Sequence, residues 1–372
     1  MFSLNYKTIK YYLNLNIYYL KFIFLLFFII FINKNKICIK RIGIIGLEHS
    51  MNIGNNLLKY AISIKLSELG YIPYIIGRKE SKSQNLSLIF KEIKYRLINE
   101  SFNEIKKDDY DLLMVNSDQT WRNWHNKIPS KDPYFYDVAF LKFSQKWNLP
   151  KFVYGASLGL DYWNFNKHDD VIAKYLIKDF TGISVREKGS IDLIHNHLGI
   201  KAEYVLDPTL LINKKNYLNL IKNYKNDIIV NNNYIVVYTL SNSPYINNFI
   251  NRIKNAYNYK IYFLTLKLKN AIEKFIYGIS NCKGVITDSY HGTLFSIIFN
   301  KPFISFLLGD NGIERFNTLK EEFNINDRIF NLKSNPNINL LEKPLIINKR
   351  VLNSLKKKSI QFLKRNLKRV YF

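Results

Sequence analysis

Apolar residues along the chain alternate between short runs typical of strands and longer stretches with helical spacing. The runs 40–46, 71–76 and 110–115 are rich in Ile, Leu and Val, as buried strands of parallel sheets are. Apolar positions in 55–69 recur mostly at three- and four-residue intervals, which predicts a helix that Gly70 ends. The alternation restarts in the second half and predicts strands at 234–240, 260–266, 284–287 and 301–306, with helices at 245–257 and 271–280.

This alternation predicts an α/β protein with two successive Rossmann-like domains and a cleft between them. The glycine fingerprint G-x-G-x-x-G of dinucleotide-binding domains is absent from the first strand–helix–strand unit. We expect four parts: a hydrophobic segment at 1–39, a first domain at 40–210, a second domain at 211–340 and a basic helix at 341–372.

The N-terminal segment contains an unbroken apolar run at 22–32, which is shorter than the roughly 20 residues of a spanning helix. Lys21 can extend toward the membrane surface, so the pattern favours a single membrane anchor. More cations follow the run than precede it, which predicts a main body on the cytoplasmic side of the cell membrane. A signal peptide, an amphipathic extension and a wrongly assigned start codon stay open, and without insertion the protein is expected in the cytoplasm.

The formal net charge of +26 is concentrated at the two ends of the chain. Residues 1–41 carry seven Lys or Arg and no acid, and residues 341–372 carry ten against one acid. We find no nucleic-acid motif and expect no nucleic-acid partner. The basic tail 351–372 is expected to be a helix that packs on the body, lies on anionic lipid or stays solvated. The two cysteines, Cys38 and Cys282, indicate neither a disulfide framework nor a metal site.

The stretch 288–295 is the strongest candidate for chemistry. It links the buried run 284–287 to an apolar helix, and such turns lie at the carboxyl edge of a parallel sheet, where open α/β folds bind ligands. The free N–H groups of a helix start also attract anions. His291 lies in this turn, and Gly292 after it lets a ligand approach the backbone.

Three other strand ends carry candidate residues, each with a structural alternative. Ser117 and Asp118 follow the strand 110–115 and suit a sugar or acid–base site, or cap the next segment. Arg186 precedes a helix and can hold a carboxylate or phosphate, or pair with the adjacent Glu187. The turn at Gly54 can hold a phosphate or act as a helix cap.

Taken in order, these motifs resemble the polysaccharide pyruvyl transferase family over about residues 41–330. Asn116 departs from the pattern, because a glycine usually precedes the Ser-Asp pair there. The matching stretches are Asn52–Asn55, Ser117–Trp121, Tyr154–Ser157, Val185–Glu187, Asp207–Pro208, Asp288–Gly292 and Glu314–Arg315.

The resemblance implies a fold similar to GT-B glycosyltransferases. It also implies transfer of a pyruvyl group from phosphoenolpyruvate to a glycan or lipid-linked oligosaccharide, making a cyclic ketal. Phosphoenolpyruvate is then the co-substrate, and no further cofactor is expected. Two alternatives remain open: a GT-B-type glycosyltransferase that uses a nucleotide sugar, and a non-catalytic, membrane-tethered glycan-binding protein.

Residue roles follow from the resemblance. His291 or Asp118 is expected to act as general acid or base, with a pKa moved toward neutrality. Arg186 and Arg315 are expected to clamp the anionic groups, and Arg186→Ala to remove activity while leaving the fold intact. The remaining substrate-binding candidates are Ser289, Gly292, Ser117, Gly54 and Asn55.

Overall fold

The computed structural model describes residues 40–46, 52–78, 87–99, 101–116, 118–123, 134–224, 233–265, 270–309 and 312–368. Residues 40–372 form one compact unit. The expected membrane anchor at 1–39 lies outside the described residues. Among the helices that the structure does describe, none combines the length and apolar character needed to cross a membrane.

The first sheet has seven parallel strands in the order β3-β2-β1-β4-β5-β6-β7. Strands β2 and β3 are therefore added on one side of β1. The chain then crosses to the other side of β1, where β4 to β7 are added in order. Open α/β sheets bind ligands at this point of reversal, outside the carboxyl ends of the two strands. The strands are β1 (Arg41–Ile45), β2 (Ile72–Arg78), β3 (Lys94–Ile98), β4 (Leu112–Val115), β5 (Lys151–Ala156), β6 (Gly182–Val185) and β7 (Glu203–Tyr204).

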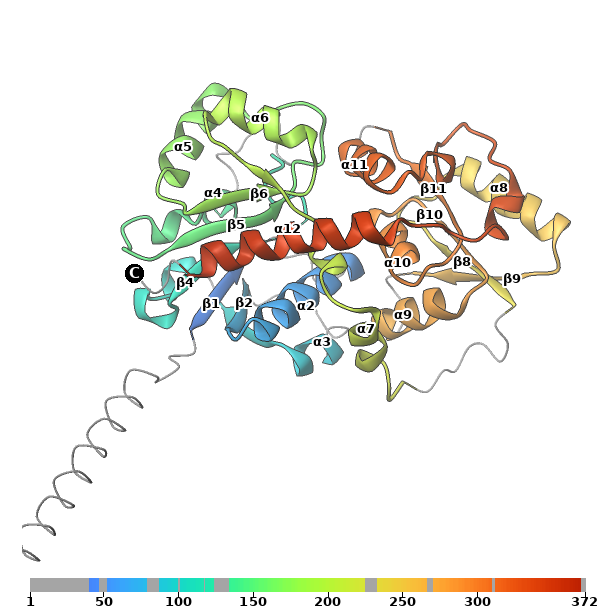
Figure 1. Cartoon of the computed structure of the whole chain (residues 1–372), viewed down its shortest axis with the longest axis horizontal. Helices are drawn as coiled ribbons and strands as arrows, with labels where there is room; N and C mark the ends of the chain where they lie inside the picture. The colour runs from blue at the N-terminus through green and yellow to red at the C-terminus, as the bar shows by residue number, and fades with distance from the viewer. Residues whose placement is uncertain are drawn as a thin grey trace, which may run out of the picture. The chain divides into compact units, whose positions relative to one another are not determined.

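Helices cover both faces of this sheet (Figure 1). Successive strand residues point to opposite faces, so Ile44 packs into one apolar cluster and Ile45 into the other. One face carries α2 (Ile53–Glu68) and α3 (Ser87–Glu92). The other carries α4 (Phe135–Phe140), α5 (Lys167–Ile177) and α6 (Gly189–Leu198).

The second sheet has five parallel strands in the order β12-β11-β10-β8-β9, so its reversal lies between β8 and β10. Two parallel α/β sheets confirm the predicted fold class, whereas the exact domain boundaries stay a prediction. The strands are β8 (Tyr234–Tyr238), β9 (Lys260–Leu264), β10 (Gly284–Thr287), β11 (Phe303–Leu307) and β12 (Ile329–Asn331). The helices are α7 (Lys214–Leu220), α8 (Pro244–Ala256), α9 (Ala271–Asn281), α10 (Tyr290–Ile298) and α11 (Ile313–Phe323).

One apolar cluster joins the two sheets. It includes Leu57 of α2, Tyr217 of α7 and Phe295 of α10, and the rings of Tyr217 and Phe295 pack at 4.9 Å. Tyr60 of α2 also donates a hydrogen bond to the Asn216 carbonyl oxygen at 3.1 Å. Short 3₁₀ segments connect the other elements at Phe102–Glu104, Lys107–Asp109, Lys142–Ser144, Pro208–Leu210, Asn326–Arg328 and Ile338–Leu341.

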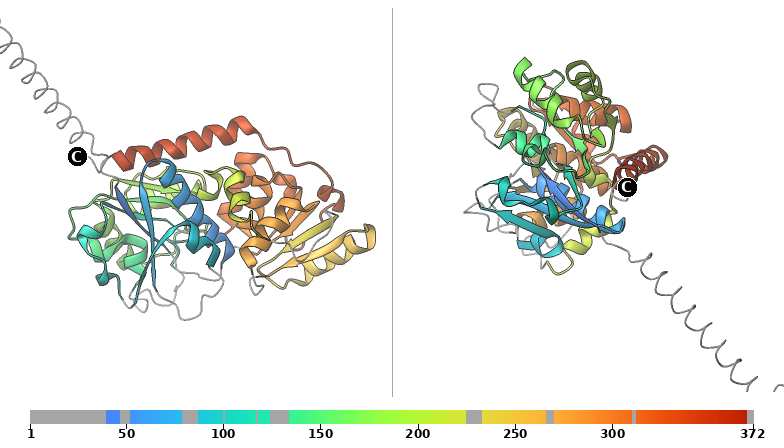
Figure 2. Two further views of the ribbon diagram at one scale, coloured as in Figure 1. Left: turned by 90° about the horizontal axis from the view of Figure 1, so that it is seen from below. Right: turned by 90° about the vertical axis from the view of Figure 1, so that its left-hand side faces the viewer.

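The last helix, α12 (Lys349–Lys368), runs from the second sheet back onto the first (Figures 1 and 2). Phe362 packs between Phe152 and Tyr154 of β5, with ring centroids 6.2 Å from each. Asn366 accepts a hydrogen bond from Thr181 at 3.0 Å. The basic tail therefore packs on the body through its apolar face.

Candidate active site where the two sheets face each other

The helix that follows β1 touches the helix that follows β10, so the reversal points of the two sheets meet. Asn52 caps α2 and Ser289 caps α10, each by accepting a backbone N–H. Gly54 in the first turn of α2 lies against the His291 ring, because a Cβ at Gly54 would be only 2.2 Å from His291 Nδ1. Gly54 and His291, which the sequence analysis singled out separately, are therefore in direct contact.

His291 is buried, with 3% of its surface exposed. Its Nε2 lies 3.8 Å from Asp207 Oδ2 and has no hydrogen-bond partner among the described residues. Burial lowers the pKa of His291, while Asp207 and Asp118 oppose this and the two nearby arginines reinforce it. The ring is therefore neutral at neutral pH and suited to accept a proton.

The lowered pKa of His291 predicts a loss of stability in acid. The unfolded histidine takes up a proton below its ordinary pKa of about 6.5, whereas the buried ring resists it until lower pH. The stabilisation that depends on a neutral His291 is complete above the unfolded pKa of about 6.5. It is lost as the pH falls from there through the lower pKa of the folded state. Urea unfolding near pH 7.5 and pH 5.5 should show a larger loss for the native chain than for His291→Gln. Equal losses would contradict the assignment.

Arg186 is buried and lies beside three carboxylates. Its terminal nitrogens contact Asp118 and Asp207, and its Nε lies 3.6 Å from Glu187 Oε1. Burial alone would lower the pKa of Arg186, but Asp118 and Asp207 raise it overall. Both terminal nitrogens therefore already hold protein carboxylates in this arrangement.

Asp118 joins two arginines from opposite halves of the fold. Arg186 donates to it from the end of β6, and Arg315 Nη1 of α11 donates to its two oxygens at 2.9 and 3.1 Å. Burial would raise the pKa of Asp118, but Arg186 and Arg315 lower it well below the ordinary value. The expectation that its pKa moves toward neutrality is therefore wrong for this arrangement, in which Asp118 stays ionised.

The ring of Tyr290 lies close to both guanidinium groups. The Cζ atoms of Arg186 and Arg315 are 4.9 and 5.0 Å from the centre of its ring, within the range of cation–π contacts. Burial raises the pKa of Tyr290, so its hydroxyl stays protonated. Tyr290 thus fixes the spacing of two cations beside His291.

Arg122 is a third guanidinium group close to this cluster. Burial lowers its pKa, and the charge of Arg315 lowers it further. Its Nη1 donates to Gln119 Oε1 at 3.1 Å. Like-charged groups disfavour each other's ionised form, so an anion close by would stabilise the charged form of Arg122.

The helix that carries Arg315 is held against the first half of the fold. The backbone N–H of Gly189 donates to Glu314 Oε1 at 3.1 Å, and that of Lys188 donates to Thr318 Oγ1 at 3.1 Å. Side chains of α11 thereby cap the start of α6. These contacts keep Arg315 opposite Asp118.

Ser289 and Gly292 have structural roles at the start of α10. Ser289 Oγ accepts the Gly292 N–H at 3.3 Å, as an N-cap does. A Cβ at Gly292 would be 2.2 Å from Thr287 Oγ1, so only glycine fits. The substrate-binding roles expected for both stay predictions, and Ser117 lies outside the described residues.

Several residues of this site, or next to it in the chain, carry polar atoms without hydrogen-bond partners. Among the described residues these include Asn55 Oδ1, His291 Nε2 and Arg315 Nε, all buried. Buried polar atoms are normally satisfied by protein or water, so several unsatisfied ones in one place are typical of a site for a polar ligand.

Three residues of this site had no role in the sequence analysis. Asp207 and Tyr290 lie inside the motifs that carried the family resemblance, and Arg122 ends the stretch that follows β4. Their positions after predicted strands were the feature of the sequence that could have marked them as candidate site residues. Nothing local indicated that Asp207 lies beside His291 or that the charge of Arg315 acts on Arg122.

Gly54→Ala should disturb His291 directly. Because the new methyl group would overlap the ring, we expect a loss of about 1–3 kcal/mol in the free energy of unfolding and a weaker activity. The matched control is Gly278→Ala in α9, where the nearest atom to a Cβ is 3.5 Å away. That change should stabilise the helix by about 0.4–1 kcal/mol. Urea unfolding of both variants measures the difference, and equal effects would remove Gly54 from the site.

A sequence profile for polysaccharide pyruvyl transferases matches residues 52–310, which is most of the chain and includes His291, Arg186, Asp118 and Asp207. The match ends before Arg315. No curated protein matches the sequence.

Solved structures show the same fold at low sequence identity. The UDP-GlcNAc 2-epimerase of Neisseria meningitidis, bound to UDP-GlcNAc, aligns with a TM-score of 0.52 and 11% identity over 88% of this chain and all of the other. The UDP-GlcNAc 2-epimerase of Methanocaldococcus jannaschii aligns with a TM-score of 0.52 and 12% identity over the same shares. A UDP-N-acetylglucosamine 2-epimerase described as putative, from Listeria monocytogenes, has a TM-score of 0.50 and 12% identity over 86% of this chain and 91% of that one. These similarities support the GT-B-like fold alone.

Proposed function

The chain belongs to the polysaccharide pyruvyl transferase family, and we propose that it moves the pyruvyl group of phosphoenolpyruvate onto a glycan as a cyclic ketal. The observation that supports this most is the meeting of His291 with guanidinium groups from both halves of the fold. A neutral histidine beside cations suits a reaction between an anionic donor and a neutral hydroxyl.

Phosphoenolpyruvate carries a carboxylate and a phosphate, so it needs at least two cationic contacts. Arg315 and Arg122 are the proposed clamp, because Arg315 lowers the pKa of Arg122 and a bound anion would stabilise the charged form of Arg122. Arg186 is proposed to act indirectly, since it already holds Asp118 and Asp207 in place. This assignment moves the clamping role expected for Arg186 to Arg122.

The proposed chemistry adds two sugar hydroxyls in turn. The first hydroxyl oxygen bonds to C2 of phosphoenolpyruvate while the methylene carbon gains a proton and becomes a methyl group. The second hydroxyl oxygen then displaces phosphate from C2, and its proton leaves with the phosphate. His291 is proposed to accept a proton from an attacking hydroxyl, with Asp207 at 3.8 Å stabilising the resulting imidazolium.

The proposed acceptor is a glycan or a lipid-linked oligosaccharide, reached on the cytoplasmic side of the cell membrane. No cofactor besides phosphoenolpyruvate enters the proposal. The reversal points of two facing α/β sheets are the usual ligand position of this architecture, which supports donor and acceptor meeting there.

Incubation of the purified chain with phosphoenolpyruvate and cell-wall glycans tests the proposal. We expect phosphate release matched by ketal formation, detected by mass spectrometry of the glycan. Arg122→Ala should raise the KM for phosphoenolpyruvate, whereas the control Lys174→Ala on α5 should leave it unchanged. Sugar transfer from a nucleotide sugar, or glycan binding without phosphate release, would instead support one of the two alternatives.

A further inference from the structure

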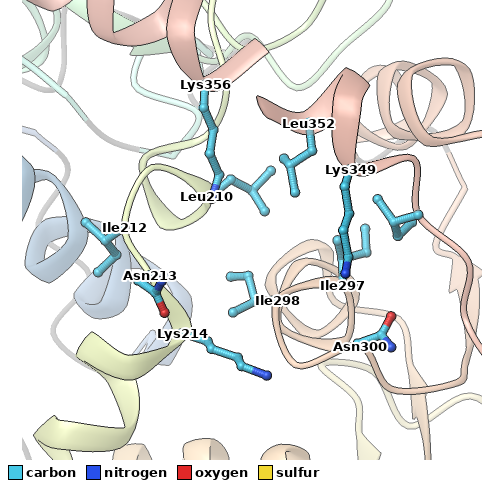
Figure 3. A pocket seen from close by; sticks show the side chains of 11 residues that line it. Leu210, Ile212, Asn213, Lys214, Ile297, Ile298, Asn300, Lys349, Leu352 and Lys356 are labelled. Atoms are coloured by element: carbon cyan, nitrogen blue, oxygen red, sulfur yellow. The ribbon is translucent and has the colours of Figure 1, made fainter. Parts of the chain in front are cut away.

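A pocket lies away from the His291 site, where the start of α7, the end of α10 and the first half of α12 meet (Figure 3). Its volume is about 390 Å³, within the range of small-molecule sites. Six of its eleven lining residues are Ile or Leu, three are Lys and two are Asn. None of these lining residues is acidic, and none belongs to the His291 cluster.

Three lysines surround this pocket. Figure 3 shows Lys349 and Lys356 extending from one side of α12 and Lys214 from the start of α7, with their side chains bordering the same hollow. Burial lowers the pKa of Lys356, and the nearby Lys65 lowers it further. Apolar walls with three cations match a ligand that has an anionic group and an apolar part.

The outer face of α12 continues this positive charge. The helix carries eight Lys or Arg and no Asp or Glu. Among the residues that the structure describes, Arg365 is the one of these eight that pairs with a carboxylate, Glu203 at 2.5 Å. Like charges at helical spacing destabilise each other, and an anionic surface relieves this repulsion. The exposed cations are Lys349, Arg350, Lys357, Lys358, Lys364, Arg365 and Lys368.

We propose that the pocket binds one anionic membrane lipid, with its headgroup among Lys214, Lys349 and Lys356 and the start of a chain on the apolar walls. The outer face of α12 then lies on the surrounding lipid surface. A free small anion would explain the pocket but not a cationic row about 30 Å long. Lys349 connects the two features, because it is exposed on α12 and also lines the pocket.

Calorimetry with a monomeric lipid tests the pocket in the full chain. We expect dihexanoylphosphatidylglycerol, below its micelle concentration, to bind at a single saturable site, and dihexanoylphosphatidylcholine and inorganic phosphate to bind much more weakly. Lys356→Met and the exposed Lys214→Met should each weaken binding about tenfold. Lys364→Met, on α12 outside the pocket, is the matched control and should change nothing. Equal binding of phosphatidylcholine or inorganic phosphate, or no effect of either pocket variant, would overturn the proposal.

Vesicle binding tests the outer face of α12. Replacing Lys357, Lys358 and Lys364 together by Ser should weaken attachment to phosphatidylglycerol-containing vesicles and reduce its dependence on salt. The native chain and the variant share residues 1–39, so any contribution of that segment cancels. Unchanged attachment of the variant to phosphatidylglycerol-containing vesicles, or an equal loss of attachment to phosphatidylcholine vesicles, would refute the membrane-facing role. Neither experiment depends on pyruvyl transfer, so its failure is distinct from failure of the proposed function.

Discussion

His291→Ala is expected to lower kcat for pyruvyl transfer by about 10²–10⁴-fold, because the proposed proton acceptor is lost. The KM for phosphoenolpyruvate should change little, since Arg122 and Arg315 are the proposed anion contacts. Phosphate release at saturating phosphoenolpyruvate and glycan measures the effect.

Two further variants separate chemistry from structure in this experiment. His291→Gln keeps much of the side-chain volume, whereas His291→Ala leaves a cavity. If both variants lose the same kcat, the cavity alone does not explain the loss. His195→Ala changes an exposed histidine on α6 and should retain native activity. Full activity in His291→Ala would remove this residue from the mechanism.

Arg186→Ala is expected to destabilise the fold, not only to inactivate it. Removing the guanidinium group would leave Asp118, Asp207 and Glu187 close together with their shared cation gone. Breaking a buried ion pair in this way costs about 3–5 kcal/mol in the free energy of unfolding. The sequence analysis expected Arg186→Ala to leave the fold intact, and the burial of Arg186 among three carboxylates predicts the opposite. Urea unfolding of the variant provides the measurement.

The charge argument for Arg186 has its own controls. Adding Asp118→Asn and Asp207→Asn to Arg186→Ala should recover part of the lost stability, because two of the unpaired carboxylates are neutralised. Arg186→Lys keeps the charge but cannot reach both carboxylates with one planar group, so an intermediate loss is expected. A variant Arg186→Ala as stable as the native chain would show that the carboxylates do not depend on this cation.

Sequence patterning predicted most of the buried elements near the site. Runs such as 110–115 and 284–287 contain the observed strands β4 and β10, since strands buried on both faces leave continuous apolar sequence. The edge strand β3 had no such run, because most of its residues are partly or fully exposed. The helix α5 was also not predicted, as its burial is confined to one side.

The turn at His291 and the entry at Gly54 were visible in the sequence, because a strand end, a cap residue and a glycine are local features. Their contact with each other was not visible, since it joins residues of two separate sheets. The same holds for Asp118 with Arg315, which are 197 positions apart. Only the packing of the two sheets on one shared apolar cluster brings such residues together.

Local chemistry and spacing thus predicted the class of fold and several candidate residues, and the ordered motifs resembled the family that the sequence profile matches. Protonation and charge pairing were decided by the tertiary structure. Burial by distant segments lowers the pKa of His291, and two arginines from different halves lower that of Asp118. A pKa depends on the solvent and charges around a group in space, and neighbouring positions in a sequence do not specify these.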